Sequence, residues 1–192
     1  CQPNSPSQNE SCARQNLSLL MRVALRRPVT QDDLKRPLDL FRETSREEGF
    51  EAGIEMALSS ILMHPEFLFR IEQTPKEIPS ETAYRISDIE LASRLSFFLW
   101  ISLPDEELLQ LAEAGRLSDT NILTQQTMRM LKDPRSQSLV NSFAGQWLYL
   151  RNLESITPDG RLYPDFGDNL RQAFRQETEL LFQEIIREDH SV

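Results

Sequence analysis

Apolar residues recur at helical spacing along almost the whole chain, and this periodicity constrains the fold more than any other feature. Between residues 88 and 102, for example, the apolar side chains Leu91, Leu95, Phe98 and Leu99 fall on one side of a helix that turns about 100° per residue. No strand-like alternation runs beyond a few positions, and only six glycines interrupt 192 residues. The pattern predicts an all-α fold, with about eight helices in a compact irregular bundle, short loops and no sheet.

Helix boundaries are indicated mainly by proline and by capping residues. Thr30 with Asp33 and Ser87 with Glu90 have the spacing of a capping box, in which each side chain bonds the other residue's backbone N–H. Pro37 predicts a kink or a delayed start in the second helix. The expected helices cover residues 11–25, 31–48, 50–63, 88–102, about 105–114, 118 to about 132, 133–150 and 168–188, with a short apolar turn at 65–71.

Residues 74–84 are the best candidate for a linker, because they contain two prolines and no apolar period. We therefore expect an N-terminal helical domain over residues 1–73, with three helices and a short turn. A C-terminal helical domain follows over residues 85–192.

Charge and motif content exclude several classes of function. The net charge is −9 and the longest basic cluster is a pair of arginines, so the chain lacks the basic footprint that nucleic acid requires. No apolar run approaches the roughly 18 residues of a membrane span. Two cysteines without a C-x-x-C-H motif or a set of four ligands predict neither attached haem nor bound zinc, so we expect no cofactor in this chain.

Both cysteines, Cys1 and Cys12, lie in the polar opening segment. We expect them to form a disulfide that closes a short loop and stabilises the fold by roughly 3 kcal/mol in the loop-entropy model. Such bonds persist outside the cytosol. Two alternatives stay open: the cysteines are unrelated free thiols, or Cys1 is a lipid-modified N-terminus.

Three charged residues fall on helix faces that are otherwise apolar. Glu177 and Glu184 lie seven positions apart on the apolar face of the last expected helix, and Arg94 lies within the apolar arc of residues 88–102. Because a buried charge is costly unless it is paired, we expect Arg94 to form a structural ion pair with one of the two glutamates. The alternatives are charges that reach the solvent at the rim, or a functional carboxylate cluster that acts as acid, base or metal site.

A second notable segment is "SFAGQWLYLRNL", residues 142–153. Phe143, Trp147 and Leu150 share one helix face, which predicts core packing, and Gly145 within the helix suggests close approach of another element. The alternative is that Trp147 stacks on a ligand. His64 precedes Pro65 at a helix end, where histidine usually caps the helix or stays solvated rather than binding a metal.

Long strings of this sequence are similar to known families. "RRPVTQDDL" with "FRETSREEGFEAGIEMALSSILMHPEFLFRIE" resembles one domain of unknown function. "YRISDIELASRLSFFLWISLPDEELLQLAEAGRLSD" with "MLKDPRSQSLVNSFAGQWLYLRNL" and "LYPDFGDNLRQAFRQETELLFQEIIREDHSV" resembles a second domain that usually follows it. Both resemble parts of large secreted bacterial proteins that carry planctomycete-type cytochrome c modules.

The resemblance implies that this chain is a fragment of an exported protein, in the periplasm or secreted, with its C-terminal domain truncated. Any haem c would sit in another module, and the partners would be other domains of that protein. We therefore expect a non-catalytic helical scaffold or docking module. The alternative is part of an enzyme that acts oxidatively or hydrolytically on extracellular polymers, with Arg94, Glu177 and Glu184 as its polar core.

Overall fold

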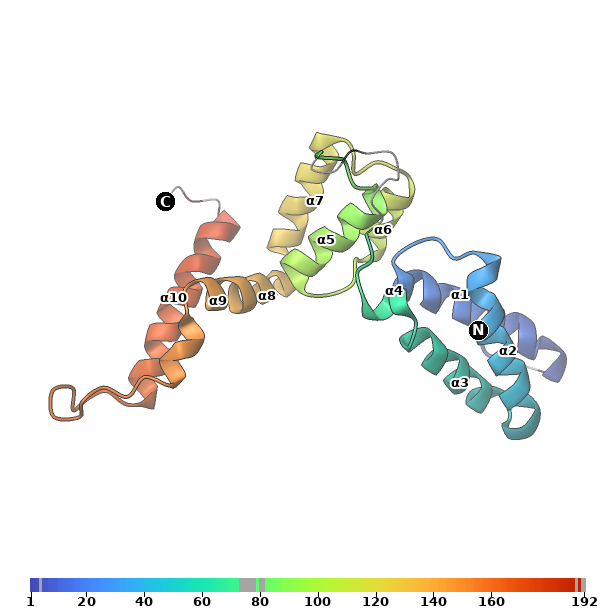
Figure 1. The fold of residues 1–192 in the computed structure, drawn as a ribbon, viewed down its shortest axis with the longest axis horizontal. Helices are drawn as coiled ribbons and strands as arrows, with labels where there is room; N and C mark the ends of the chain where they lie inside the picture. The colour runs from blue at the N-terminus through green and yellow to red at the C-terminus, as the bar shows by residue number, and fades with distance from the viewer. Residues whose placement is uncertain (4, 73–78, 80–81, 189, 191–192) are drawn as a thin grey trace. The chain divides into compact units, whose positions relative to one another are not determined.

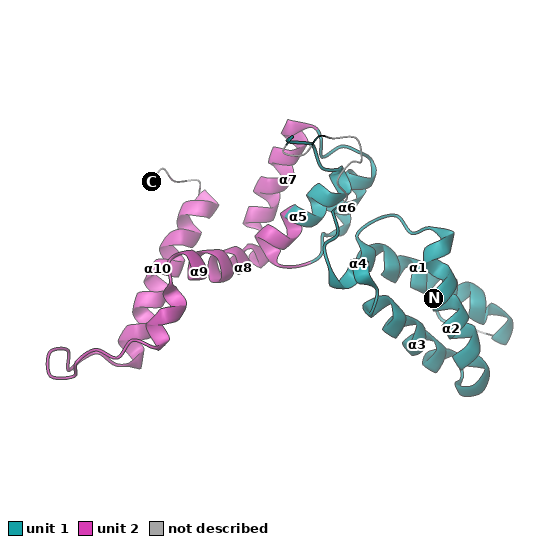
Figure 2. Ribbon diagram, viewed as in Figure 1, with its two compact units in different colours: residues 1–94, 103–118 teal, residues 95–102, 119–192 magenta. Residues whose placement is uncertain are grey.

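The described residues of the computed structural model, which are 1–3, 5–72, 79, 82–188 and 190, contain helices and connecting turns and no strand. The predicted all-α class is therefore confirmed for this part of the chain. Most of the expected linker at 74–84 lies outside the described residues. Figure 1 shows the helices in chain order, and Figure 2 divides the chain into two compact units, each of which is described by itself below.

Unit 1 comprises residues 1–94 and 103–118. It begins with a short 3-10 turn and holds most of the N-terminal helices, the first half of α5, and α6. The bounds are Pro6–Gln8 for the turn, Asn9–Leu25 for α1, Gln31–Glu48 for α2, Phe50–Leu62 for α3, Pro65–Leu68 for α4, Asp88–Trp100 for α5 and Glu106–Glu113 for α6.

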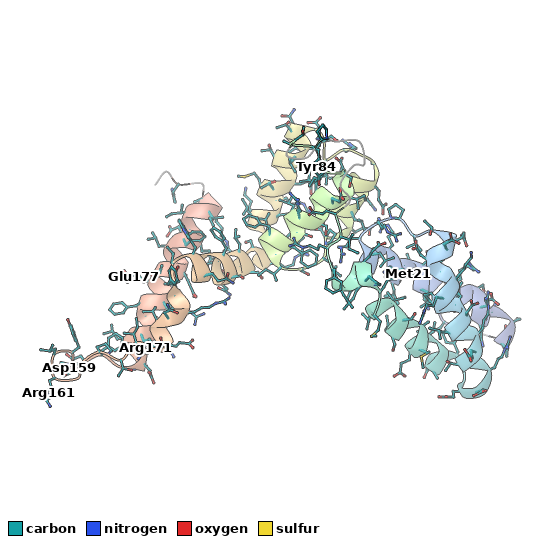
Figure 3. The ribbon with its side chains drawn as sticks, in the orientation of Figure 1. Met21, Tyr84, Asp159, Arg161, Arg171 and Glu177 are labelled. Atoms are coloured by element: carbon teal, nitrogen blue, oxygen red, sulfur yellow. A yellow bond between two sulfur atoms is a disulfide. The ribbon has the colours of Figure 1, made fainter. Side chains whose placement is uncertain are left out.

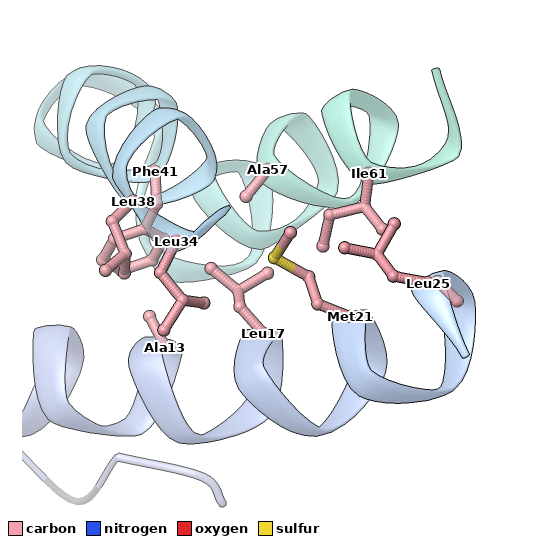
Figure 4. Packing of buried hydrophobic residues seen from close by; sticks show 10 residues of the cluster. Ala13, Leu17, Met21, Leu25, Leu34, Leu38, Phe41, Ala57 and Ile61 are labelled. Atoms are coloured by element: carbon pink, nitrogen blue, oxygen red, sulfur yellow. The ribbon is translucent and has the colours of Figure 1, made fainter. Parts of the chain in front are cut away.

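The hydrophobic core of unit 1 lies between α1, α2 and α3 (Figure 4). Helix α1 contributes side chains at helical spacing, among them Leu17 and Met21, and α3 contributes Ile61. Gly53 in α3 lies directly against α2, because a Cβ atom added there would stand 2.8 Å from the Phe41 ring and 2.9 Å from the Phe41 carbonyl oxygen. This close approach explains why glycine, a weak helix former, occupies the middle of α3.

Two helices of unit 1 begin at the capping residues that the sequence predicted. Thr30 and Asp33 form the expected capping box at α2, and Ser87 and Glu90 exchange the same pair of bonds at α5. Helix α2 begins at Gln31 and continues through Pro37, so its start is not delayed. The expectation that a helix begins at Ser118 is wrong, because Asp119 caps α7 instead and Ser118 bonds Asp88 at 2.9 Å.

Unit 2 comprises residues 95–102 and 119–192, with α7 at Thr120–Lys132 and α10 at Asp168–Glu188. Between them the expected single helix over 133–150 is divided. A 3-10 turn at Pro134–Ser136 leads into α8 at Gln137–Leu139, a π-helical turn at Val140–Ala144 and α9 at Gly145–Trp147. Tyr149 then adopts a left-handed conformation with φ 56°, which ends the helix one residue before a 3-10 turn at Leu150–Glu154.

Trp100, at the end of α5, anchors the core of unit 2. Its ring is 2% exposed, and its indole N–H donates to the carbonyl oxygen of Met130 on α7 at 3.0 Å. The guanidinium carbon of Arg135 lies 3.5 Å from the ring centroid, which is the geometry of a cation–π contact. The end of α7 and the turn that follows it are thereby held against α5.

Candidate functional site: an arginine-lined cavity and an aromatic patch

A cavity of about 650 Å³ opens within unit 1. Its walls come from four stretches that are distant in sequence: the end of α1, the segment from α4 to residue 72, the first half of α5 with the residues before it, and Ser118. Five arginines line it, namely Arg26, Arg27, Arg70, Arg85 and Arg94, together with the carboxylates of Glu66, Glu72, Asp88 and Glu90.

Arg26 ends α1 in a left-handed conformation, with φ 58°, and its side chain is drawn into the protein. Its guanidinium donates to the carbonyl oxygens of Glu66 and of Phe69, the latter at 3.2 Å, and so holds the turn around α4. The residue is only 5% exposed. This burial lowers the pKa of Arg26; the Glu66 charge opposes that effect and the neighbouring positive charge of Arg70 adds to it.

Arg27 binds different partners from those of Arg26, its neighbour in the sequence. Its guanidinium binds Asp33 through two bonds of 2.8 and 3.0 Å, and Glu66 through two more of 2.7 and 3.1 Å. The hydrogen bonds that Arg27 donates to these two carboxylates raise the pKa of Arg27 and hold the pKa of Asp33 well below its usual value. The start of α2 and the start of α4 are thus tied to one cation.

The prediction that Arg94 is buried and pairs with Glu177 or Glu184 is wrong. The Arg94 side chain is 52% exposed, and it forms a bidentate pair with Glu72, with an Nε–Oε1 distance of 2.7 Å. The hydrogen bonds of this pair raise the pKa of Arg94 and lower that of Glu72. The helix periodicity placed Arg94 within the apolar arc, but α5 is packed closely on only part of that arc, so the guanidinium reaches solvent.

The two glutamates lie on the other unit. Glu177 and Glu184 are both exposed on α10, where Figure 3 labels Glu177. Their expected burial is therefore also incorrect, because α10 has no buried residue among those described. Arg94 belongs to unit 1, whereas both glutamates belong to unit 2.

His64 lies at the start of α4. The Nδ1 atom of His64 accepts a hydrogen bond from the backbone N–H of Glu66 at 3.2 Å, so His64 caps α4 as the sequence indicated. Within the described parts of the chain, no three side chains of His, Cys, Asp or Glu are grouped so that they could hold an ion. Among the same residues, no helix has the length and apolar character that a bilayer span requires.

The structure pairs Cys1 with Cys12, and their Cα atoms lie 5.4 Å apart. Cys12 is buried in α1, at 1% exposure, so the pair fastens the start of the chain to the core helix. Asn16 adds two bonds of 2.9 Å to the backbone of Cys1, one to its amino group and one to its carbonyl oxygen. This pairing agrees with the expected disulfide, and the alternative of two unrelated free thiols does not hold for this arrangement.

Unit 2 carries a cluster of four aromatic rings, three of them exposed and Phe182 half-buried, which we call the aromatic patch: Phe98, Phe143, Trp147 and Phe182. Phe143 stacks on Trp147 at a centroid distance of 5.8 Å, and Phe98 and Phe182 contact Phe143 at 6.1 and 6.4 Å. Yet Phe98, Phe143 and Trp147 are 55%, 45% and 63% exposed. Core packing was the wrong prediction for Phe143 and Trp147, although Leu150 is buried as expected.

The two segments that carry Phe98, Phe143 and Trp147 are uncharged, whereas Phe182 lies on α10 between Glu179 and Glu184. Residues 95–104 and 137–149 contain no charged side chain, in a chain of which 27% of residues are charged. Gly145 does not mark a close approach, because a Cβ atom there would meet nothing within 4 Å. Trp147 does not line the arginine cavity, nor a smaller apolar pocket of about 420 Å³ between the loop at 158–166 and the start of α10.

Sequence reasoning selected Arg94 but missed the arginine cavity as a whole. Its walls come from residues up to 93 positions apart, between Leu25 and Ser118, and no short motif connects them. The sequence singled out Phe98, Phe143 and Trp147 but not Phe182. Their exposure depends on which faces the neighbouring helices leave uncovered, and helical periodicity does not report this.

Comparisons with known proteins identify the chain by family alone. Residues 86–192 match the family model of PSD4, described as a protein of unknown function (DUF1592), and residues 12–72 match that of PSD5, a protein of unknown function (DUF1595). A search of curated proteins found no match, and a search of solved structures found none either. The first match spans more than half of the sequence. The chain therefore belongs to the PSD4 family of proteins of unknown function (DUF1592).

Proposed function

We propose that this chain is a non-catalytic helical docking module of an exported multidomain protein, and that its aromatic patch binds a cytochrome c domain of the same protein. The observation that carries the proposal is the exposure of Phe98, Phe143 and Trp147, whose rings contact one another and the half-buried Phe182. Large aromatic side chains without neighbouring charges are characteristic of the centre of a protein–protein interface.

Two further features support an exported, multidomain setting. The Cys1–Cys12 pair is of a kind that persists outside the cytosol, so we place the protein in the periplasm or outside the cell. The resemblance to secreted cytochrome-bearing proteins supplies the proposed partner. A folded domain suits the aromatic patch better than a small ligand, because the rings form a surface rather than lining a pocket.

We retain as part of the proposal a division into domains at 1–73 and 85–192 with a linker at 74–84. The family matches at 12–72 and 86–192 support this division. The compact units of the structure divide the chain differently, because the first half of α5 and all of α6 join the N-terminal helices. The N-terminal helices therefore do not pack only among themselves.

The enzyme alternative has less support. Its polar core was to consist of Arg94, Glu177 and Glu184, but Arg94 is occupied by Glu72 and the two glutamates are exposed on α10. A catalytic acid or base usually has a perturbed pKa in a cleft, where its geometry places it beside a substrate. Arg94 lines the arginine cavity, but its guanidinium is bound by Glu72, and the two glutamates lie outside that cavity.

The docking proposal predicts that Phe143→Ser combined with Trp147→Ser releases the bound domain in the longer exported protein. Loss of two aromatic contacts weakens the interface, and an undocked domain samples positions farther away. We expect small-angle X-ray scattering to give a larger radius of gyration for this double variant than for the natural protein.

The matched control is Leu19→Ser combined with Leu20→Ser on α1. These leucines are 61% and 44% exposed, almost the same as Trp147 and Phe143, but they lie outside the aromatic patch. The radius of gyration of this control variant should equal that of the natural protein. The patch variant, the control variant and the natural protein should all have the same helical circular dichroism. Equal radii for the patch variant and the control would contradict the proposal.

A further inference from the structure

Two residues of unit 2 have a backbone conformation that normally belongs to glycine. Ile101 directly follows α5 with φ 52°, and Tyr149 lies two positions after the end of α9 with φ 56°. In this left-handed region a Cβ atom is crowded by the following carbonyl oxygen, so the conformation costs free energy. The cost is greatest for bulky and β-branched residues, and both isoleucine and tyrosine are of this kind.

At comparable positions elsewhere the chain has glycine. Gly49 follows α2 with φ 94°, and Gly115 lies two positions after the end of α6 with φ 66°. Glycine turns the chain at a helix end without crowding, because it has no Cβ atom. A larger residue at such a position needs a side-chain contact that offsets the cost of the backbone conformation.

Arg26 shows such a contact within the fold. It is the third non-glycine residue with a positive φ in the described part of the chain. Its buried guanidinium donates to the backbone carbonyl oxygens of Glu66 and Phe69, which glycine could not do. The side chain of Arg26 therefore stabilises unit 1 at the position where its backbone is strained.

The side chains of Ile101 and Tyr149 are instead directed largely to solvent. Ile101 is 52% exposed and Tyr149 is 72% exposed. Burial of apolar area is what an isoleucine or tyrosine side chain contributes to stability, and most of that area is not buried here. Within this chain, glycine would serve at Tyr149 at least as well. The contact that favours tyrosine is therefore to be sought outside the chain.

Both residues adjoin the aromatic patch. Ile101 comes three positions after Phe98 and Tyr149 two positions after Trp147, so the Cα atoms of each pair lie within about 11 and 7 Å. Both fall in the uncharged segments 95–104 and 137–149. Irregular backbone of this kind is concentrated at functional sites, and the π-helical turn that carries Phe143 precedes Tyr149 in the same segment.

We propose that Ile101 and Tyr149 extend the docking surface of the aromatic patch and contact the same partner domain. The inference rests on the proposed function, because it takes the same partner. It adds that the two side chains lower the stability of the free chain and strengthen docking. The partner presents an apolar, uncharged face to these two segments, because a charge buried there would find no opposite charge on them.

Thermal melts of this chain test the first half of the proposal. Tyr149→Gly should raise the melting temperature by about 2–4 °C, as expected when one strained residue is relieved. Ile101→Gly, which also loses some burial, should melt no lower than the natural chain. A Tyr149→Gly chain that melted no higher than the natural chain would overturn the proposal, because its side chain would then serve the fold.

Met63→Gly is the matched control. Met63 also ends a helix, α3, and is 75% exposed, but its φ is −88° and it lies in unit 1 outside the aromatic patch. Glycine at this position relieves no strain, so the melting temperature should not rise. A rise equal to that of Tyr149→Gly would show that the gain does not come from the left-handed conformation, and would overturn the proposal.

Hydrogen–deuterium exchange at 179–185, a segment that none of these substitutions alters, tests the second half. Exchange there should be slower in the longer exported protein than in this chain alone. In the longer protein, Tyr149→Gly and Ile101→Gly should each lose most of this slowing, and Met63→Gly should lose none. Full slowing in both patch variants would overturn this inference and leave the proposed function standing. No slowing in the natural longer protein would overturn both.

Discussion

Two consecutive arginines of this chain illustrate how little a residue's type says about its role. Arg26 is buried and donates to backbone carbonyls, whereas Arg27 is shared by two carboxylates on α2 and α4. Their partners lie up to 43 positions away, so the sequence presents them only as a short basic pair. By contrast, the Thr30–Asp33 cap joins residues three positions apart, and its spacing alone predicted it correctly.

The Asp33 carboxylate predicts how the stability of the fold depends on pH. Its pKa is held well below the ordinary value of an aspartate, mainly by the hydrogen bonds from Arg27, with further help from the backbone and hydroxyl of Thr30. Because the folded-state pKa is below the unfolded one, its stabilisation is complete above the unfolded pKa and is lost as the pH falls toward the folded value. Below about pH 4 we therefore expect a loss of about 1–3 kcal/mol, a typical contribution of hydrogen bonds to a charged group.

Thermal melts from pH 6 to pH 2 measure this loss. The melting temperature of Asp33→Asn should be lower at pH 6 and should fall less on acidification than that of the natural chain. Asp32→Asn is the control, since the Asp32 side chain is 84% exposed and contacts only Lys35 among the described ion pairs. If Asp33→Asn and the natural chain lost stability in parallel down to pH 2, the assignment to the Arg27–Asp33 contact would be wrong.

At the scale of elements, the sequence correctly predicted where several helices begin. The starts of α2, α3, α5 and α10 agree with the expectation, because capping residues and proline act on their own helix. The division of residues 133–150 into short helical pieces was missed, since a π-helical turn has no strong propensity signature. The sequence also predicted a buried apolar face on α10, and this face is exposed instead. Periodicity shows that a helix has an apolar face, but it does not show which element covers that face.

Two helical glycines allow a direct test of helix packing. Gly53→Ala places a methyl group 2.8 Å from the Phe41 ring and from the Ser45 Cβ, so α2 and α3 must separate. We expect a destabilisation of about 1–3 kcal/mol, as for other overpacked cores. Gly145→Ala meets nothing within 4 Å, so the higher helix propensity of alanine should leave stability unchanged or raise it by up to about 1 kcal/mol.

Chemical denaturation of the two variants gives the comparison in one experiment. The midpoint for Gly53→Ala should fall below that of the natural chain, and the midpoint for Gly145→Ala should not. A stabilising effect of Gly53→Ala would show that α2 and α3 do not approach as closely as the structure has them.

For the whole molecule, the arginine cavity lies in unit 1 and the aromatic patch lies in unit 2. Both features depend on residues far apart in sequence. In unit 1, the guanidinium groups of Arg26, Arg27 and Arg94 are engaged in bonds that support the fold. In unit 2, Phe98, Phe143 and Trp147 are exposed on segments without charged residues.

Hydrogen–deuterium exchange of the aromatic patch tests the docking account most directly, with this chain compared in isolation and within the longer exported protein. The account predicts slower exchange in the longer protein for the segments at 141–149 and 179–185, which carry three of the four rings, and unchanged exchange at 17–23 on α1. Equal exchange of all three segments in both proteins would contradict it.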